Sequence, residues 1–555
     1  MRYYNNPVSD TTKPDPFILQ VEGVYYCYST HTDGIKVSMS DDLIHFEDRG
    51  FAYQKEDERD FWAPATIYLN GIYYMYFSSV DKIKTDTLEE KLKVASSRNP
   101  LGPFKFERQL FNFFSIDAQP YFHRGSLYLF YSTNVLGCDD DMPGTSILVD
   151  KMINPLEVEG LPKIVVKPTL KDEVFQINRF DDNRDWYTIE GASIIERNNK
   201  LYILYSANSY LNENYFINYS VGDLEEDLRD IDFKKYPDDY TYHALLKKNN
   251  LVGGTGHNSV CKGPNLITDF IIYHGRNNDI AFDIDKEQRT MRVDRLFFNG
   301  DKLYCDGPSL NKIKMPDSPL KCEKDIVLSN SSKKIDIEGN YILDLWIKGI
   351  PSHSGIRFGV LIGERLDIEL IQGIPYISIY RVNGNIRSKI QEIKISSDFD
   401  FEVSHCFKIK KIFDTVYLEL EDNRKFKIEL NLLDNLEIYS LFGKSQIISY
   451  TLNWYDNLEN ETLIYLDNFF KISKRIEIID NHINLINNTS MRAKCIGIHS
   501  LTVIPLSKDS CIYVNDKKYD ILEICNIEFN KRKNEEILLT FDKVQITKLE
   551  YKKLQ

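Results

Sequence analysis

The sequence lacks the segments that would place it in or across a membrane. No run of about 18 apolar residues, the length that spans a bilayer as a helix, occurs in its 555 residues. The N-terminal stretch MRYYNNPVSD carries no apolar segment of the kind found in secretion signals. We therefore predict neither a membrane span nor a signal peptide, and expect a cytoplasmic protein with no membrane partner.

Paired cysteines are also absent. The nine cysteines include no CxxC pair and no regular spacing, and their odd number leaves at least one unpaired within the chain. A disulfide framework or a cysteine zinc site requires such spacing. Cys27 lies in the strand-like VYYCYST, where a buried free thiol is the usual state. The cysteines thus predict a reducing compartment, which agrees with a cytoplasmic location.

An excess of positive charge is missing as well. The chain has 69 Lys and Arg against 83 Asp and Glu, a formal net charge of −14. Nucleic acids and anionic membranes bind basic faces, because basic side chains release the counterions held by phosphates. We therefore expect no nucleic-acid partner, and a neutral small molecule or glycan as the ligand.

Aromatic residues are abundant by comparison, with 35 Tyr and 31 Phe. They lie in short apolar runs with Ile and Val, which favour strands over helices. At roughly 100 to 200 residues per domain, the chain is long enough for two to four domains. The composition therefore predicts an all-β protein with more than one domain.

One strand pattern recurs through the first 280 residues: a turn residue, then aromatic and aliphatic residues that end in serine. Copies begin at Gly23, Gly71, Gly125 and Asn199, with a weaker fifth copy at Phe270. Repeats of about 40 to 50 residues that hold several strands are typical of a propeller. Unrelated hairpins in a sandwich are the alternative. Similar apolar segments precede several copies, so we predict a five-bladed β-propeller over residues 1–310.

The pattern stops near residue 310, where SLNKIKMPDSPLK marks a boundary. Alternating strands rich in Ile, Lys, Asn and Asp follow. We predict a C-terminal β-sandwich region over residues 311–555, either one module or two with a break near residue 431.

Acidic residues precede several of the repeated hairpins. The innermost strand of each propeller blade lines the central channel, so these positions converge. They carry Asp15, Trp62, Asp117 and Glu190. Asp15 lies between two prolines in KPDPF, which favour extended backbone before them; a simple turn aspartate is the alternative.

Three such carboxyl groups are suited to the acid and base hydrolysis of a glycosidic bond, which needs one protonated and one ionised group. A like-charged neighbour raises the pKa of a carboxyl group. We therefore expect Asp117 to keep Glu190 protonated near neutral pH while Asp15 stays ionised.

Five motifs occur in order over about residues 1–305: KPDPFIL, FWAPATIYLNGIYYMY, SIDAQPYF, IEGASIIERNNKLYILYS and GTGHNSV. Together they resemble glycoside hydrolase family 43, whose five-bladed propellers act on arabinose- and xylose-containing glycans. The resemblance implies that Asp15 is the general base, Glu190 the general acid and Asp117 the pKa modulator of an inverting displacement, with the acid and base roughly 6.5 to 9.5 Å apart.

The resemblance also implies three supporting residues. Trp62 would offer its ring to a sugar, Arg292 would bond sugar hydroxyls, and His257 would line the cavity and hold a metal ion, often calcium, through water. The alternatives are a core tryptophan, a surface arginine and a structural histidine. A single histidine provides no cage, so such a calcium ion would be largely water-coordinated. No other cofactor is expected.

The implied function is an exo-acting glycosidase that removes terminal α-L-arabinofuranosyl or β-D-xylosyl residues from short plant-derived oligosaccharides. Departures from the family pattern at Lys13 and Ala192 leave the choice of pentose open. In exo-acting relatives a C-terminal sandwich often closes one side of the pocket, and such modules can mediate self-association, so a homo-oligomer is also considered. The alternatives are a retaining hydrolase of the sucrose and fructan type, whose R-D-P and E-C motifs are missing here, and a non-catalytic carbohydrate-binding propeller.

Overall fold

The computed structural model describes most of the chain. It covers residues 2–455 apart from 87–88, 136–141, 180–182, 282, 284–285, 300, 338, 350–352, 360–363, 413–414 and 430–434, and then the segments 470–472, 477–479, 482–485, 489–505, 510–514, 517–520, 525–542 and 544–552. Strands dominate, and the helices are short 3-10 turns such as η2 (Lys171–Glu173) and η3 (Leu228–Asp230). No helix within these ranges is long and apolar enough to cross a membrane.

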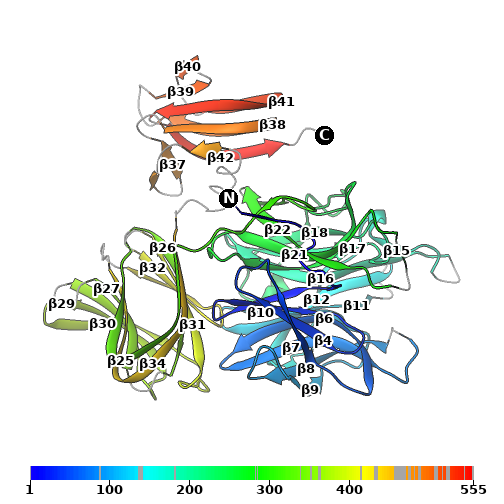
Figure 1. The fold of residues 1–555 in the computed structure, drawn as a ribbon, viewed down its shortest axis with the longest axis horizontal. Helices are drawn as coiled ribbons and strands as arrows, with labels where there is room; N and C mark the ends of the chain where they lie inside the picture. Colours follow the sequence, from blue (N-terminus) through cyan, green and yellow to red (C-terminus); the bar gives the residue numbers. More distant parts are fainter. Residues whose placement is uncertain are drawn as a thin grey trace. The chain divides into compact units, whose positions relative to one another are not determined.

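The first 305 residues form the five antiparallel blades of a propeller, drawn from blue to green in Figure 1. This confirms the predicted fold class. A short parallel pairing between β12 and β16 joins the third and fourth blades into one sheet. The blades are β2 (Phe17–Val21), β3 (Val24–Ser29), β4 (Ile35–Ser40) and β5 (Glu47–Tyr53); β6 (Glu58–Leu69), β7 (Ile72–Asp81), β8 (Lys91–Ser97) and β9 (Lys105–Gln109); β10 (Ile116–His123), β11 (Ser126–Val135), β12 (Gly144–Asn154) and β14 (Lys163–Val166), with β13 (Glu157–Val158) beside β12; β16 (Trp186–Arg197), β17 (Lys200–Ala207), β18 (Phe216–Asp223) and β19 (Lys234–Lys235), with β15 (Val174–Gln176) beside β16; and β20 (Val252–Lys262), β21 (Asp269–Asn277), β22 (Thr290–Asn299) and β23 (Lys302–Cys305).

The repeated aromatic pattern is the second strand of each blade: β3, β7, β11, β17 and β21. These strands are buried on both faces, as in β17, where every residue after the first is buried. A strand between two packed blades has no solvent face, so it reads as a nearly continuous apolar run rather than an alternating one. This explains why the five copies could be recognised in the sequence.

The N-terminal segment closes the ring. The backbone N–H groups of Val8 and Lys13 donate to the carbonyls of Met291 and Arg289, each at 3.0 Å. Farther out, β1 (Tyr3–Tyr4) pairs with β24 (Ile313–Lys314). The chain therefore enters the first blade alongside the last one, which places Asp15 next to side chains of the fifth blade.

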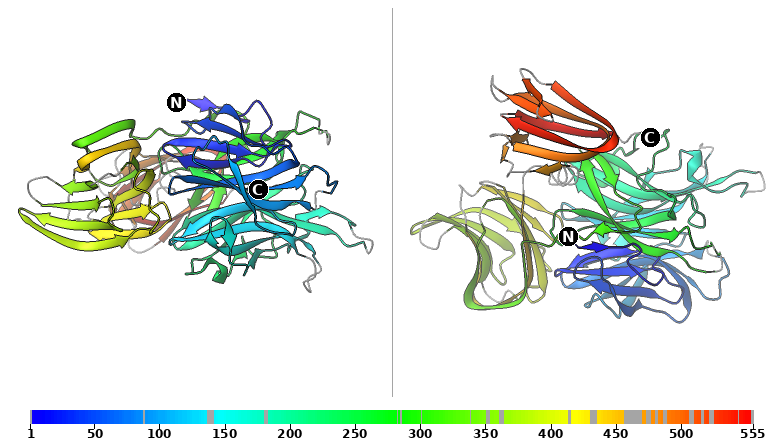
Figure 2. Two further views of the ribbon diagram at one scale, coloured as in Figure 1. Left: turned by 90° about the horizontal axis from the view of Figure 1, so that it is seen from below. Right: turned by 45° about the horizontal axis from the view of Figure 1, so that its top comes forward.

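A ten-stranded sheet follows the propeller and folds over on itself into two layers, seen in yellow-green in Figure 2. Its inner faces share one apolar core that includes Leu343, Phe358, Ile379 and Ile438. The predicted break near residue 431 lies outside the described residues; β33 before it and β34 after it belong to this same sheet. The strands are β25 (Lys321–Ile335), β26 (Tyr341–Lys348), β27 (His353–Gly359), β28 (Glu364–Leu370), β29 (Tyr376–Asn383), β30 (Ile386–Lys394), β31 (Ser404–Ile412), β32 (Thr415–Leu420), β33 (Lys425–Glu429) and β34 (Leu436–Trp454).

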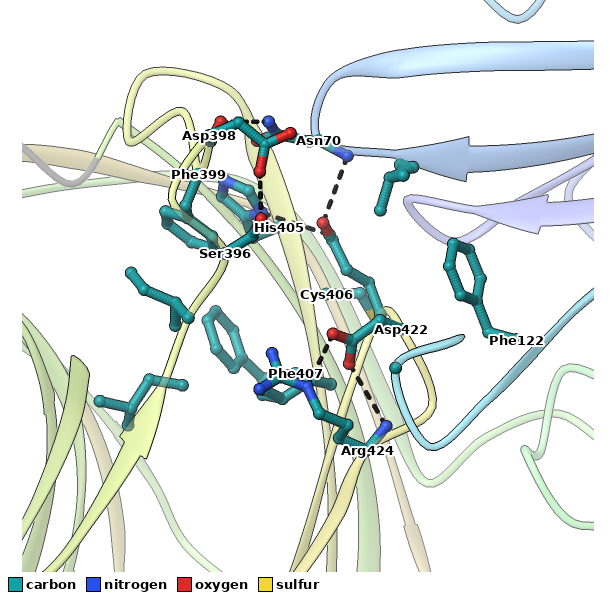
Figure 3. Close-up of a pocket in the computed structure, with 16 residues that line it drawn as sticks. Asn70, Phe122, Ser396, Asp398, Phe399, His405, Cys406, Phe407, Asp422 and Arg424 are labelled. Atoms are coloured by element: carbon teal, nitrogen blue, oxygen red, sulfur yellow. Dashed lines mark hydrogen bonds and ion pairs between the residues drawn. The ribbon is translucent and has the colours of Figure 1, made fainter. Parts of the chain in front are cut away.

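The sandwich contacts the hairpin turns that connect the first and second strands of the blades. Asn70 shows the pattern: its N–H donates to Glu421, and its side-chain oxygen accepts from the N–H of Asp400 at 2.8 Å. These contacts border a pocket of about 160 Å³, where His405 and Arg424 are also paired with neighbouring groups (Figure 3). Further contacts join Gly125 to Asp422, Glu196 to Lys425 and Asn265 to Asn453. Side chains of Ser449 and Val403 occupy the space into which a β-carbon on Gly23 or Gly71 would point.

These turns lie at the ends of the innermost strands away from the predicted catalytic residues. Arg197, the end of β16, lies seven positions after Glu190, about 23 Å at the usual rise of a strand. The sandwich therefore supports the propeller from the side opposite the carboxyl groups, which differs from the expected closure of the pocket by this region.

A second compact unit comprises residues 296–304 and 454–555. Its described strands form an eight-stranded antiparallel sheet. They are β35 (Phe470–Ile472), β36 (Glu477–Ile479), β37 (His482–Leu485), β38 (Thr489–Pro505), β39 (Cys511–Val514), β40 (Lys517–Asp520), β41 (Cys525–Asp542) and β42 (Val544–Lys552).

Candidate active site

All five blades share one unusual backbone position, located in the innermost strand or directly before it. The residue there has a positive φ, between 41° and 65°, and in blades two to five the pairing with the second strand shifts around it. Such bulges redirect side chains, and left-handed backbone at a non-glycine residue is strained unless its surroundings hold it. The five residues are Asp15, Ala63, Asp117, Gly191 and His257. All except Gly191 line one small central cavity, so two of the predicted carboxyl groups, Asp15 and Asp117, lie together there.

Asp15 is 7 % exposed and has several partners. Its Oδ2 accepts a hydrogen bond from Thr30 at 2.6 Å, and its Oδ1 lies 3.2 Å from Arg289 Nη1. The Nδ1 atoms of His257 and His274 lie 3.6 and 3.2 Å from the same Oδ1. Burial acts to raise the pKa of Asp15, but the charge of Arg289, with help from the histidines, holds it well below its usual value. Asp15 is therefore ionised at neutral pH.

Glu190 is a partly exposed residue of β16. Its environment raises its pKa, whereas that of Asp15 is lowered. Its Oε1 accepts a hydrogen bond from the Tyr215 hydroxyl at 2.7 Å. Burial is the largest influence on its pKa, the bond from Tyr215 lowers it, and the charge of Asp15 raises it. The net result raises the pKa of Glu190 to about 7. A large fraction of Glu190 therefore carries a proton at neutral pH.

Asp117 lies beside Glu190 and is 6 % exposed. Its Oδ2 accepts a hydrogen bond from the Gly191 N–H at 3.1 Å. Burial, and then the charges of Glu190 and Asp15, raise its pKa well above the usual value. The sequence attributed the protonation of Glu190 to the charge of Asp117; the structure gives burial as the main cause for both groups.

Trp62 and His257 also lie at the channel. Trp62 is partly exposed and directly precedes Ala63, so it occupies the same place in its blade as Glu190 does in the fourth. His257 Nδ1 lies between the two aspartates, 3.6 Å from Asp15 Oδ1 and 4.0 Å from Asp117 Oδ2. Burial lowers the pKa of His257, so its ring is neutral at neutral pH.

Arg292 does not reach the pocket, which corrects its predicted role. Its side chain is fully buried within the fifth blade, where Nη2 donates to Asn277. The arginine that contacts Asp15 is Arg289, whose guanidinium also lies 5.0 Å from the ring centre of Tyr210. RTMRVDR contains three arginines three residues apart, and nothing in their spacing distinguishes Arg289. In the fold, the backbone hydrogen bond from the Lys13 N–H to the Arg289 carbonyl places Arg289 beside Asp15.

The donor groups around His257 do not suit a calcium ion held by the protein. No cluster of three or more His, Cys, Asp or Glu side chains with metal-binding geometry occurs among the described residues. Calcium takes six to eight oxygen ligands, whereas the nearest carboxylate oxygen, on Asp15, is already paired with Arg289. We therefore assign no step of the chemistry to a metal.

Hydrolysis by the full chain is accordingly expected to be unchanged after dialysis against EGTA, because Arg289 and hydrogen bonds set the charge and position of Asp15. The measurement is the initial rate before and after chelation, with metal content determined by mass spectrometry. A large loss that CaCl₂ restores would contradict this expectation and support the water-coordinated calcium ion predicted at His257.

Known proteins resemble this chain over the propeller. The extracellular exo-α-(1→5)-L-arabinofuranosidase of Streptomyces avermitilis is 26 % identical over 251 residues, 43 % of this chain and 48 % of that protein. The enzyme of the same name from Streptomyces chartreusis is 25 % identical over 229 residues, 39 % of this chain and 62 % of that protein. A crystal structure of a thermostable family-43 glycoside hydrolase is 30 % identical, with 57 % of this chain and 99 % of that one covered and a TM-score of 0.49. The chain thus spans about half the length of the first curated relative.

These relatives contradict the predicted cytoplasmic location. Both Streptomyces enzymes are named extracellular, which points to secretion. Unpaired cysteines were a poor guide, because a thiol buried in a packed core is inert in any compartment. Cys27, Cys406 and Cys511 are buried free thiols of this kind.

The comparison with protein families decides the classification. The profile of glycosyl hydrolases family 43 matches residues 4–304, more than half of the 555 residues and the whole of the propeller up to β23. The matched segment contains the carboxyl groups that the blades bring together. The chain belongs to glycosyl hydrolases family 43.

Proposed function

We propose that the chain is an inverting, exo-acting α-L-arabinofuranosidase that removes terminal arabinofuranosyl residues from short plant-derived oligosaccharides. One observation carries the proposal: two neighbouring carboxyl groups have opposite pKa shifts, with Asp15 held ionised and the pKa of Glu190 raised to about 7. The names of the Streptomyces relatives support arabinose over xylose, which the sequence left open.

The two groups divide the reaction between them. Asp15 accepts a proton from a water molecule whose oxygen attacks the anomeric carbon. The bond from that carbon to the leaving oxygen breaks as Glu190 donates its proton to this oxygen. One water is consumed, and attack from the face opposite the leaving group inverts the anomeric configuration. Asp117 accepts the N–H of Gly191 and so holds the backbone next to Glu190. Trp62 is partly exposed and offers its ring to the sugar.

The pH dependence follows from these roles. Glu190 must be protonated, so kcat/KM is expected to fall as the pH rises through about 7. Asp15 must be ionised, and its lowered pKa places the acid limb well below pH 4. The profile of kcat/KM on an α-(1→5)-linked arabino-oligosaccharide, whose leaving group needs a proton, measures both limbs of the free enzyme. A basic limb near the pKa of an ordinary glutamate, about 4.3, would contradict the assignment of Glu190.

Substrate choice is tested by hydrolysis of 4-nitrophenyl α-L-arabinofuranoside and 4-nitrophenyl β-D-xylopyranoside side by side, followed by α-(1→5)-linked arabino-oligosaccharides. We expect the arabinofuranoside to be cleaved faster and the oligosaccharides to release arabinose one unit at a time. Faster cleavage of the xyloside would replace the proposed pentose, and release of longer fragments would show endo action. Binding of these sugars without any hydrolysis would favour a non-catalytic binding propeller.

A further inference from the structure

Two stacked rings lie between the proposed acid and base. The Tyr215 hydroxyl donates to Glu190 Oε1 at 2.7 Å, and the backbone N–H of Asp15 donates to His274 Nδ1 at 3.2 Å. The Tyr215 and His274 rings are nearly parallel, at 11°, with their centres 5.8 Å apart. This distance is within the range of stacked aromatic pairs. The two rings thus form a continuous path of contacts from Asp15 to Glu190.

The ring pair is packed closely between the surrounding strands. Tyr215 is 1 % exposed and His274 is fully buried. Gly256 on β20 is the register partner of His274 on β21. A β-carbon at Gly256 would lie only 1.9 Å from Cε1 of Tyr215, so only glycine admits the tyrosine ring at this point. The fold therefore provides a fitted slot for this pair.

His274 acts on the backbone of Asp15. Its Nδ1 accepts the Asp15 N–H at 3.2 Å and lies 3.2 Å from Asp15 Oδ1, and burial lowers the pKa of His274 to about 4. The ring is therefore uncharged at neutral pH and leaves the balance of charge to Arg289. Asp15 has the strained φ of 50°, which persists only where neighbouring groups hold it. The hydrogen bond from the Asp15 N–H to His274 Nδ1 is one of the contacts that hold this backbone conformation.

We propose that Tyr215 and His274 are a positioning pair, in which His274 holds the backbone of the general base, Tyr215 holds the general acid, and the ring stack fixes the two relative to each other. The inference rests on the proposed function for the roles of Asp15 and Glu190. Both rings are buried, so the pair acts through these carboxyl groups. Other charged or titratable groups near Glu190 are Asp15, Asp117, Arg289 and Tyr210.

Two variants separate the two halves of the pair while keeping a ring in each place. Tyr215→Phe removes only the hydroxyl, so we expect it to impair general-acid catalysis by Glu190. On glycosides with poor leaving groups kcat should fall about tenfold, which corresponds to the loss of one hydrogen bond. On glycosides with good leaving groups the fall should be much smaller. His274→Phe removes only the acceptor, so we expect a base defect of similar size on every leaving group. His274→Asn, which restores an acceptor, should recover part of the loss.

A second measurement does not depend on turnover. The titration of the Glu190 carboxyl carbon is followed by ¹³C NMR and assigned with Glu190→Gln. The Tyr215 bond lowers the pKa of Glu190, so Tyr215→Phe should raise the titration midpoint by about one pH unit. Tyr219→Phe is the matched control, a fully buried tyrosine of the same blade that stacks on Tyr236 instead.

The outcomes are distinct. A raised midpoint in Tyr215→Phe but not in Tyr219→Phe, with opposite leaving-group behaviour of the two ring variants, supports the pair. A wild-type midpoint in Tyr215→Phe, or the same leaving-group dependence in both variants, overturns it. If the unmutated chain cleaves no pentoside, the proposed function fails, while the NMR titration still decides whether Tyr215 controls Glu190.

Discussion

Glu190→Gln is expected to lower kcat by about 10²- to 10⁴-fold on arabino-oligosaccharides, because the amide cannot give a proton to the leaving oxygen. On 4-nitrophenyl arabinofuranoside the loss should be far smaller, since this leaving group departs without protonation. The basic limb near pH 7 should also disappear, because it reports the loss of the Glu190 proton. Initial rates on both substrates across a pH series measure all three effects.

Glu213→Gln provides the control for this change. Glu213 is an exposed glutamate that pairs with Lys248, and its replacement should leave rates and pH profile as in the unmutated enzyme. If Glu190→Gln loses the same factor on both substrates and keeps the basic limb, Glu190 is not the acid.

Asp15→Asn is expected to lower kcat by about 10²- to 10⁴-fold on every substrate, whatever the leaving group, because no other ionised carboxylate takes its place at the water. Asp117 cannot substitute, since burial and its neighbours favour its protonated form. The measurement is kcat on a series of aryl arabinofuranosides of differing leaving-group strength. The slope of log kcat against leaving-group pKa should stay unchanged while the whole line moves down.

Asp10→Asn is the matched control for Asp15, since it lies in the same N-terminal segment and is exposed. We expect wild-type rates from it. Activity of Asp15→Asn within a few-fold of the unmutated enzyme would contradict the role of Asp15 as general base.

Features that depend on residues close together in the sequence could be predicted. The second strand of each blade is buried on both faces, so its aromatic pattern could be recognised five times. Asp15 and Asp117 occupy the same left-handed position of their blades, and Glu190 lies one residue before it. Their common place could be predicted because each precedes a copy of the repeat.

Contacts between distant segments could not be predicted in this way. Arg289 meets Asp15 across 274 residues, and only the closure of the ring by the N-terminal segment selects it over Arg292. Tyr215 follows a loop in the fourth blade, and its slot exists because Gly256 of the fifth blade lacks a side chain. Neither residue belongs to a repeated motif, so no pattern marked them.

The contacts between the sandwich and the hairpin turns of the blades could not be predicted either. Pairs such as Asn70–Gly71 and Arg124–Gly125 have positive φ at both residues, which is typical of tight hairpin turns. Their sequences predict the turns themselves. The residues that cover the turns lie hundreds of positions later, and alternation within those later strands does not indicate their partner.

The central claim is that an ionised Asp15 takes a proton from the attacking water while a protonated Glu190 gives its proton to the leaving oxygen. The most direct test of this claim is the anomeric configuration of the first sugar released. Hydrolysis of 4-nitrophenyl α-L-arabinofuranoside is followed by ¹H NMR before mutarotation. The account predicts β-L-arabinofuranose as the initial product. Initial release of the α-anomer would show retention and a covalent intermediate, and would contradict the roles assigned to both carboxyl groups.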